Sequence, residues 1–174
     1  MYLISIYFDE KTNRRIQQYI DKVAEKTGNT FMLEGQVPPH ITISAFVTQN
    51  EAVVIETLNS LTHHLKMGNL TWASVGQFFP YVIYMTPVLN AYLHEMAELI
   101  YDALVTVEGV QVNTHYRPFQ WLPHTTIAKK LSKEEMRIAF EVLQDSFGMF
   151  EGEVVKIGLA KPNPHRDIAT WELR

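Results

Sequence analysis

The chain has no cysteine among its 174 residues. This absence excludes disulfide bonds, thiol nucleophiles and zinc sites built from cysteine. The sequence also contains neither the H-E-x-x-H pattern nor a His-x-His pair, both of which commonly hold a catalytic metal ion. We therefore predict no metal site and no cofactor from these patterns.

An excess of basic charge and a long apolar run are also missing. The chain has 15 Lys and Arg against 19 Asp and Glu, a net charge of −4, which argues against a broad non-specific grip on nucleic acid. A small phosphorylated ligand or the end of an RNA strand remains compatible with this charge. No stretch is long and apolar enough to span a membrane, and the first residues, MYLISIYFDE, lack the features of a signal peptide. We expect a cytoplasmic protein without membrane contact.

The segments that are present predict an α+β protein with a mainly antiparallel sheet. Apolar residues make up 47% and charged residues 20% of the chain, as is usual for a soluble globular protein. The length suits one domain, or two small lobes that share an interface. Strands are expected at residues 2–8, 40–47, 70–76, 81–86, 124–129, 153–160 and 167–173. Helices are expected between them, with loops at 29–39 and 109–120.

Local signals predict where several of these elements begin and end. Asp9 should cap the first helix and Gly28 should end it. Thr48-x-x-Glu51 and Ser132-x-x-Glu135 both have the spacing of a capping box, and Gly68 should close the helix that follows the first box. Pro162-Asn163-Pro164 should form the turn between the last two strands.

One short motif occurs twice. PHITI occupies residues 39–43 and PHTTI occupies residues 123–127, so that His40 and His124 each stand two residues before a threonine. With only 8 Pro and 7 His in the chain, chance is a poor explanation. A structural repeat would preserve the apolar letters more readily than the polar ones, yet here the proline, histidine and threonine are the residues that recur.

Two His-x-Thr strands that face each other can perform acid–base chemistry on a phosphodiester. Residues i and i+2 of a strand point to the same side, so His40 stands beside Thr42 and His124 beside Thr126. A neutral imidazole can take a proton from the attacking water or hydroxyl, and a protonated imidazole can give one to the departing oxygen. The threonine hydroxyls can donate to the phosphate oxygens. A single such motif would usually have no function, and metal binding by the histidines is the main alternative for the pair.

The paired motifs resemble those of the 2H phosphoesterase superfamily, within its bacterial 2′-5′ RNA ligase (LigT-like) and cyclic phosphodiesterase branch. The similarity extends over nearly the whole chain, including VIYMTPVLNAYLHEMAELI at 82–100, WLPHTTIAK at 121–129 and the closing hairpin. It implies a bilobal fold over residues 1–174, with two mainly antiparallel sheets, flanking helices and pseudo-twofold symmetry about a central groove. It also implies no required metal. By motif position, His40 and His124 would be catalytic, and Thr42 and Thr126 would bind phosphate.

The sequence departs from this family beside both motifs. Many relatives have arginine where Ser44 stands, and after the second motif they often have alanine then arginine where this chain has Ala128 then Lys129. Lysine keeps the charge but loses the bidentate geometry of arginine, so the substrate preference is what these changes affect. We include Ser44, Lys129 and Arg117 as candidate substrate contacts.

Aromatic residues near the motifs are candidates for stacking on a base. Trp121 precedes His124 by three residues, and the similar candidates are Phe46, Tyr81, Tyr84 and Tyr116. The triplet His165-Arg166-Asp167 spells a kinase motif, but no glycine-rich loop or D-F-G accompanies it, and it is set aside.

Two functions from different classes follow. The first is a metal-independent phosphoesterase acting on 2′,3′-cyclic phosphate or 2′-5′ phosphodiester ends of nucleotides or RNA, with ligation as the reverse reaction. The alternative is a non-catalytic module that binds nucleotides or RNA ends. Intact histidines favour the enzyme, since binding alone needs no acid–base pair. In either case we expect a monomer.

Overall fold

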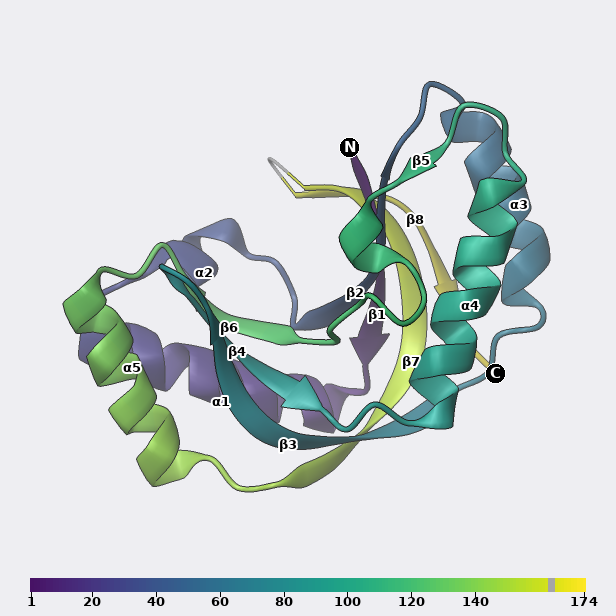
Figure 1. The fold of residues 1–174 in the computed structure, drawn as a ribbon. Coiled ribbons are helices and arrows are strands. Elements are labelled where there is room, and N and C mark those ends of the chain that lie inside the picture. The colour runs from purple at the N-terminus through teal and green to yellow at the C-terminus, as the bar shows by residue number, and fades with distance from the viewer. Residues whose placement is uncertain (163–164) are drawn as a thin grey trace.

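The computed structural model describes residues 1–162 and 165–174 (Figure 1). The helices and strands follow one another in this order: β1 (Tyr2–Phe8), α1 (Glu10–Thr27), α2 (Phe31–Gly35), β2 (His40–Val47), α3 (Glu51–Thr62), β3 (Gly68–Phe78), β4 (Val82–Pro87), α4 (Ala91–Val105), β5 (Gln111–Val112), the 3-10 helix η1 (Thr114–Tyr116), β6 (Thr125–Lys129), α5 (Lys133–Ser146), β7 (Phe150–Lys161) and β8 (Arg166–Glu172).

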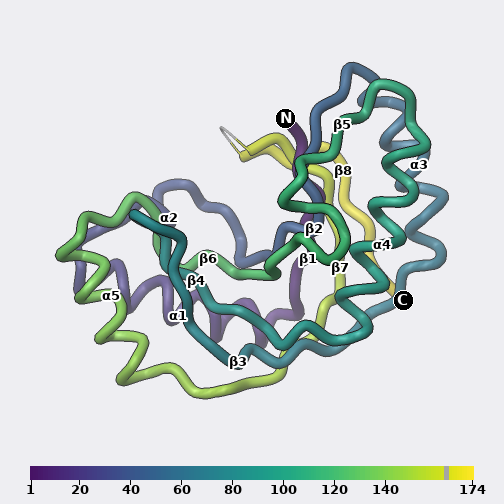
Figure 2. The backbone as a smooth tube through the Cα atoms, in the orientation of Figure 1, coloured from purple at the N-terminus to yellow at the C-terminus, as the bar shows by residue number. Residues whose placement is uncertain are grey.

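The strands form one antiparallel sheet in the order β5-β2-β1-β7-β3-β4-β6, with β8 paired to β7. The predicted α+β class with antiparallel strands is thus confirmed. The two expected sheets are the two ends of this single sheet, and β7 joins them. Residues 150–154 of β7 pair with β3, whereas residues 154–160 pair with β1. In Figure 2 the chain of β7 curves from the end of α5 to the β1 side.

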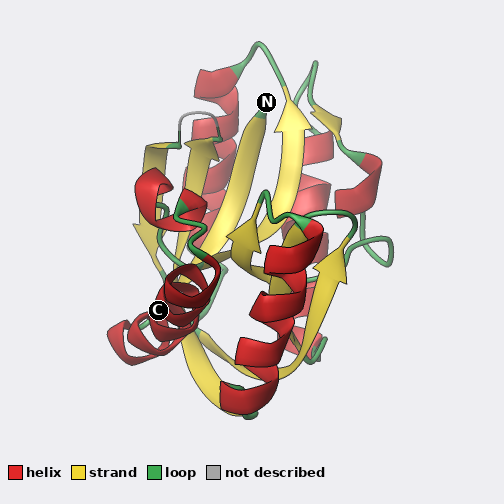
Figure 3. Ribbon diagram, turned by 90° about the vertical axis from the view of Figure 1, so that its left-hand side faces the viewer, coloured by secondary structure: helices red, strands yellow, loops and turns green. Residues whose placement is uncertain are grey.

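The helices cover the two ends of the sheet separately. Helices α1, α2 and α5 pack beside β4 and β6, and helices α3 and α4 pack together beside β2 and β5. Figure 3 shows the helices flanking the strands. Each end therefore holds one His-x-Thr strand, β2 on one side and β6 on the other. None of the helices in the described residues is long and apolar enough to cross a membrane.

A buried aromatic cluster holds the two ends of the sheet together. Trp72 on β3 is fully buried, stacks on Phe150 of β7 at a centroid distance of 5.0 Å and meets the edge of Phe8 of β1 at 4.9 Å. The indole nitrogen of Trp72 donates a hydrogen bond to Thr125 Oγ1 at 3.2 Å, next to the second motif histidine. Rings of this size contribute a large share of core stability, so this cluster fixes β6 relative to β1.

Several end signals that the sequence predicts are present. Asp9 accepts hydrogen bonds from the backbone nitrogens of Lys11 and Thr12, and Gly28 ends α1 with a positive φ of 75°. Ser132 and Glu135 form a complete capping box at the start of α5. Each satisfies backbone groups that a helix end would otherwise leave without a partner.

The predicted capping box at Thr48 is wrong. Helix α3 is preceded by Asn50, which makes no side-chain capping bond, and Thr48 Oγ1 instead accepts from the backbone nitrogen of Asn50 at 3.0 Å. The carboxylate of Glu51 is used elsewhere, because it accepts from the Tyr2 hydroxyl at 2.9 Å and pairs with Lys161 at 2.9 Å. Tertiary partners therefore outcompete the local motif.

Other differences concern short elements and boundaries. Helix α3 ends at Thr62, well before Gly68, which begins β3. The two expected loops contain α2 in one case, and β5 and η1 in the other. Elements of two to five residues leave too little periodicity to be read from sequence. The expected turn at Pro162-Asn163-Pro164 includes residues 163–164, which lie outside the described residues; β7 and β8 pair on either side of it.

Candidate functional site

Strands β2 and β6 bring the two His-x-Thr motifs into one region. Cα atoms of the two strands approach within 8 Å of each other. The indole nitrogen of Trp121, three residues before His124, donates a hydrogen bond to the backbone oxygen of Thr42 at 3.0 Å. Segments 79 residues apart in sequence are thus tied together beside both motifs.

Both histidines are held in the same way. His40 Nδ1 lies 2.8 Å from the backbone oxygen of Pro38, and His124 Nδ1 lies 2.9 Å from the backbone oxygen of Leu122. In each motif a proline, Pro39 or Pro123, separates the carbonyl from the histidine, and its fixed φ restricts both segments to a similar path. The repeated proline of the motif therefore serves to orient the imidazole.

This hydrogen bond decides which ring nitrogen remains for chemistry. A carbonyl oxygen can only accept, so Nδ1 must carry the proton in both rings. Nε2 is then the atom that gains or loses a proton when either ring titrates. An imidazole whose other nitrogen is fixed in this way is held in one tautomer and one orientation, as acid–base catalysis requires.

Burial lowers the pKa of both histidines. For His40, burial is the largest cause, the hydrogen bond to Pro38 acts in the opposite direction, and the nearby His165 and His124 lower the pKa further. For His124, burial again comes first, and the charge of Lys129 adds to it. His124 is among the groups that lower the pKa of His40, so the two rings lie within electrostatic range of each other. Both rings are therefore predominantly neutral at pH 7 in the free protein.

The two motif threonines differ in their surroundings. Thr42 is buried, and its hydroxyl shares a hydrogen bond of 3.3 Å with the hydroxyl of Ser5 on the neighbouring β1. Thr126 is half-buried and pairs with Tyr84 across β4 and β6. Its neighbour Thr125 is fully buried and belongs to the core. Thr126 is thus the more accessible residue of the pair.

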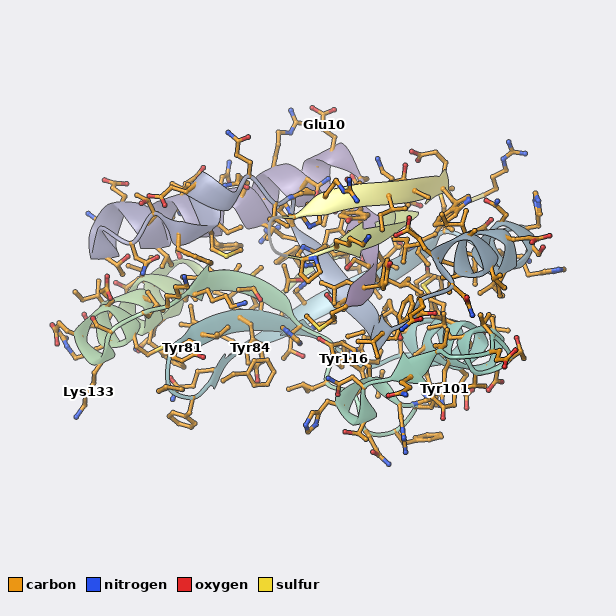
Figure 4. All side chains as sticks on the ribbon, turned by 90° about the horizontal axis from the view of Figure 1, so that it is seen from above. Glu10, Tyr81, Tyr84, Tyr101, Tyr116 and Lys133 are labelled. Atoms are coloured by element: carbon orange, nitrogen blue, oxygen red, sulfur yellow. The ribbon has the colours of Figure 1, made fainter. Side chains whose placement is uncertain are left out.

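Two aromatic rings enclose His124. The Phe78 ring meets its imidazole edge to face at a centroid distance of 4.8 Å, and Tyr84 lies at 5.4 Å. Figure 4 shows Tyr84 with Tyr81 along the start of β4, and Tyr116 between them and Tyr101 of α4. Tyr84 is among the residues expected from the sequence, whereas Phe78, which stands at the end of β3 and is 37% exposed, is not. An exposed ring beside a histidine offers a surface on which a base can stack.

The remaining candidate residues differ in their exposure to solvent. Lys129 is exposed at the end of β6, and its positive charge lowers the pKa of His124. Arg117 is exposed just after η1. Trp121 is half-buried, and its ring nitrogen is engaged with Thr42. Ser44 is 2% exposed, and its hydroxyl finds no hydrogen-bond partner among the described residues.

The triplet that spells a kinase motif in the sequence lies beside His40. Asp167 raises the pKa of His40 and His165 lowers it. The Tyr7 ring lies 6.2 Å from the His40 ring. Tyr7 pairs with His40 across β1 and β2. No sequence signal links residue 7 to residue 167, because sheet pairing alone brings them together. Within residues 1–162 and 165–174, no group of three or more His, Cys, Asp or Glu is placed to hold a metal ion.

One protein family and several solved structures resemble the chain over most of its length. Residues 12–166 match the profile of the 2′-5′ RNA ligase superfamily. The structure of E. coli LigT complexed with 3′-AMP is similar with a TM-score of 0.60 and 17% identity, covering 99% of this chain and 97% of that one. A protein of Thermus thermophilus is similar with a TM-score of 0.59 and 15% identity over 99% and 97% of the two chains. No protein of curated function matches the sequence.

Proposed function

Because the chain belongs to the 2′-5′ RNA ligase superfamily, we propose that it is a metal-independent phosphoesterase acting on 2′,3′-cyclic phosphate or 2′-5′ phosphodiester ends of nucleotides or RNA. His40 and His124 are the acid–base pair of this proposal, and Thr42 and Thr126 bind the phosphate. The observation that carries the proposal is the matched pair of imidazoles, each held through Nδ1 by the carbonyl two residues earlier.

The reaction on a 2′,3′-cyclic phosphate needs two proton transfers. One neutral imidazole accepts a proton at Nε2 from water, whose oxygen attacks the phosphorus. The bond from phosphorus to the 3′ oxygen breaks, and the second imidazole, protonated at Nε2, gives its proton to that oxygen. The product is a 2′-phosphate with a free 3′-hydroxyl. Attack by a 5′-hydroxyl in place of water joins two strands through a 2′-5′ linkage, which is the ligation direction.

Charge in the site is compatible with an anionic substrate. Both histidines have a lowered pKa in the free protein, and a bound phosphate anion favours their protonated forms. Lys129 supplies positive charge beside His124, and Phe78 and Tyr84 supply a surface for a base. Arg117 is the second basic residue that we propose as a substrate contact. E. coli LigT is a relative of the same fold whose structures hold 3′-AMP or phosphate. We further propose that residues 1–174 act as one bilobal domain and as a monomer.

The test is an assay of 2′,3′-cyclic nucleotides and 2′-5′ dinucleotides in excess EDTA, as a function of pH. We expect turnover in EDTA and a bell-shaped dependence on pH, whose limbs belong to the histidine pair. Because the substrate anion raises both pKa values, the optimum of kcat should lie at higher pH than the optimum of kcat/KM, which reports the free enzyme.

Two other outcomes point elsewhere. Activity that climbs to a plateau at high pH and disappears in EDTA until a divalent cation is added would indicate a metal-activated hydroxide instead. Tight binding of cyclic nucleotides without turnover on any substrate would indicate a binding module. A matched His40→Ala, His124→Ala protein, purified in the same way, controls for contaminating phosphodiesterases.

A further inference from the structure

The hairpin of β7 and β8 brings Asp167 and His165 to the side of His40. Asp167 pairs with Ala160 across the hairpin, and its carboxylate reaches the buried Tyr7 of β1. The Tyr7 hydroxyl donates to Asp167 Oδ1 at 3.3 Å, while its ring lies 6.2 Å from the His40 ring. Three strands that are distant in sequence therefore meet around one imidazole.

The packing around Tyr7 fixes the hydrogen bond that its hydroxyl donates to Asp167. A Cβ at position 158 would come within 2.8 Å of the Tyr7 ring, so Gly158 leaves the space that the ring occupies. Burial and then the charge of Asp167 raise the pKa of Tyr7, so its hydroxyl keeps its proton and remains a donor. The carboxylate is thus fixed by a neutral donor, and Tyr7 does not cancel its charge.

His165 is the third member of the group. His165 Nε2 lies 3.3 Å from Asp167 Oδ1, at the same oxygen that Tyr7 contacts. The Nε2 atom is buried, and among the described residues it has no hydrogen-bond partner, so its contact with Asp167 is electrostatic. The intervening Arg166 is exposed, and its charge lowers the pKa of Glu51 instead.

We propose that Asp167 and His165 are positioning residues that set the proton-binding equilibrium of His40. This inference rests on the proposed function, in which His40 must exchange a proton in each turnover. Asp167 and His165 need not touch the substrate to do this. They act through the charge that they place beside the His40 ring.

The two residues act in opposite directions. A carboxylate beside an imidazole stabilises the protonated ring, whereas a second protonated imidazole destabilises it. Burial is the main cause of the lowered pKa of His40. Among the nearby charged groups, His165 lowers this pKa further and Asp167 raises it. The other groups that face His40 are Tyr7 on β1, which stays neutral, and His124 before β6. Asp167 and His165 therefore favour opposite protonation states of the His40 ring.

This arrangement predicts opposite shifts from two single substitutions. Asp167→Asn removes the negative charge without changing the shape of the side chain, so His40 should titrate at lower pH than in the wild type. His165→Gln removes the imidazole that lowers the pKa of His40, so His40 should titrate at higher pH. The double variant should fall between the two, because the charges that it removes largely cancel.

The experiment is an NMR titration of the His40 ring without substrate, with its signal assigned by its loss in His40→Gln. Arg166→Gln is the matched control, because it removes from the same hairpin a charge that affects Glu51 and is not among the charges acting on His40. This variant should leave the His40 titration unchanged. His165→Asn provides a second variant if the glutamine variant does not fold. Shifts in the same direction for Asp167→Asn and His165→Gln, or no shift in either, would overturn the proposal.

Activity gives the functional arm of the same test. The limb of the kcat/KM profile that belongs to His40 should move with the NMR titration in each variant, down in pH for Asp167→Asn and up for His165→Gln. If the two variants shift the NMR titration in opposite directions but the protein turns over no substrate, the effect of Asp167 and His165 on His40 stands and the proposed phosphoesterase activity is rejected. Turnover whose limbs stay fixed in both variants would reject the role of the pair in the reaction.

Discussion

The motif histidines use their two ring nitrogens for different purposes. Nδ1 is held by a carbonyl oxygen in both rings, so the proton transfers of the proposed reaction fall to Nε2. A residue that occupied the same place without a titratable nitrogen would keep the fold and lose the chemistry. In the proposed reaction the threonines, by contrast, supply hydroxyls to phosphate oxygens, and they should contribute less.

We therefore expect a graded loss of activity at the motif residues. His40→Ala and His124→Ala should each lower kcat at least ~100-fold, the usual contribution of a positioned acid or base. Thr126→Val, which keeps the shape of the side chain but removes its hydroxyl, should lower kcat roughly 10- to 1,000-fold, as for an oxyanion donor. His63→Ala, at an exposed position at the end of α3, is the control and should leave kcat unchanged. Near-full activity of His40→Ala on every accepted substrate would refute the assignment.

The helix ends separate a true capping box from a sequence that only resembles one. Ser132→Ala removes a hydroxyl that caps α5, and we expect a loss of about 0.5–2 kcal/mol in the free energy of unfolding. Thr48→Ala removes a hydroxyl that caps no helix, so its cost should stay within about 0.5 kcal/mol. Urea unfolding of the two variants measures the difference. Equal losses would mean that the two ends are capped alike.

The strands β3 and β4 position His124 through a glycine. A Cβ at Gly76 would lie 2.6 Å from the Tyr84 hydroxyl, so Gly76→Ala must displace the ring that lies beside His124. We expect kcat to fall about 10- to 100-fold, as small misplacements of catalytic groups do. Gly148→Ala is the matched control, because a Cβ there meets nothing within 4 Å. Unchanged kcat in Gly76→Ala would mean that Tyr84 does not help to position His124.

At the scale of elements, periodicity and end signals predict the long helices and strands because these depend on local chemistry. The first strand, α1, β2 and α5 lie where the sequence places them. The failures come from tertiary contacts. Glu51 binds Tyr2 and Lys161 and leaves the helix uncapped, and β7 runs through both halves of the sheet, which no local pattern reveals.

At the scale of the molecule, the repeated motif predicts the centre of the site, and the family resemblance that it suggests is confirmed. Its surroundings could not be predicted, because they come from pairing across strands. Phe78 reaches His124 from β3, and Asp167 reaches Tyr7 from the last hairpin, with 160 residues between them. The triplet His165-Arg166-Asp167, which is set aside as a kinase motif, comes to lie beside Tyr7 and His40 only through the pairing of strands in the folded sheet.

Burial of the two histidines should also make the whole molecule sensitive to mild acid. Their folded-state pKa values are lowered, whereas in the unfolded chain each takes up its proton near pH 6.5. Below that pH the unfolded chain binds more protons than the folded one, so stability is fully present above about pH 6.5 and is lost as pH falls toward the folded-state values. Carboxyl groups contribute only at lower pH, since they titrate near pH 4 when unfolded.

We therefore expect the urea midpoint of the wild type to fall between pH 7.5 and pH 5.5. The double variant His40→Gln, His124→Gln keeps polar side chains at both positions but cannot take up protons there, so its midpoint should fall less over the same range. His63→Gln with His64→Gln, which replaces two exposed histidines, should behave as the wild type does. If both double variants lose stability as steeply as the wild type, the acid sensitivity arises outside the site, and burial does not hold the two motif imidazoles in their neutral form.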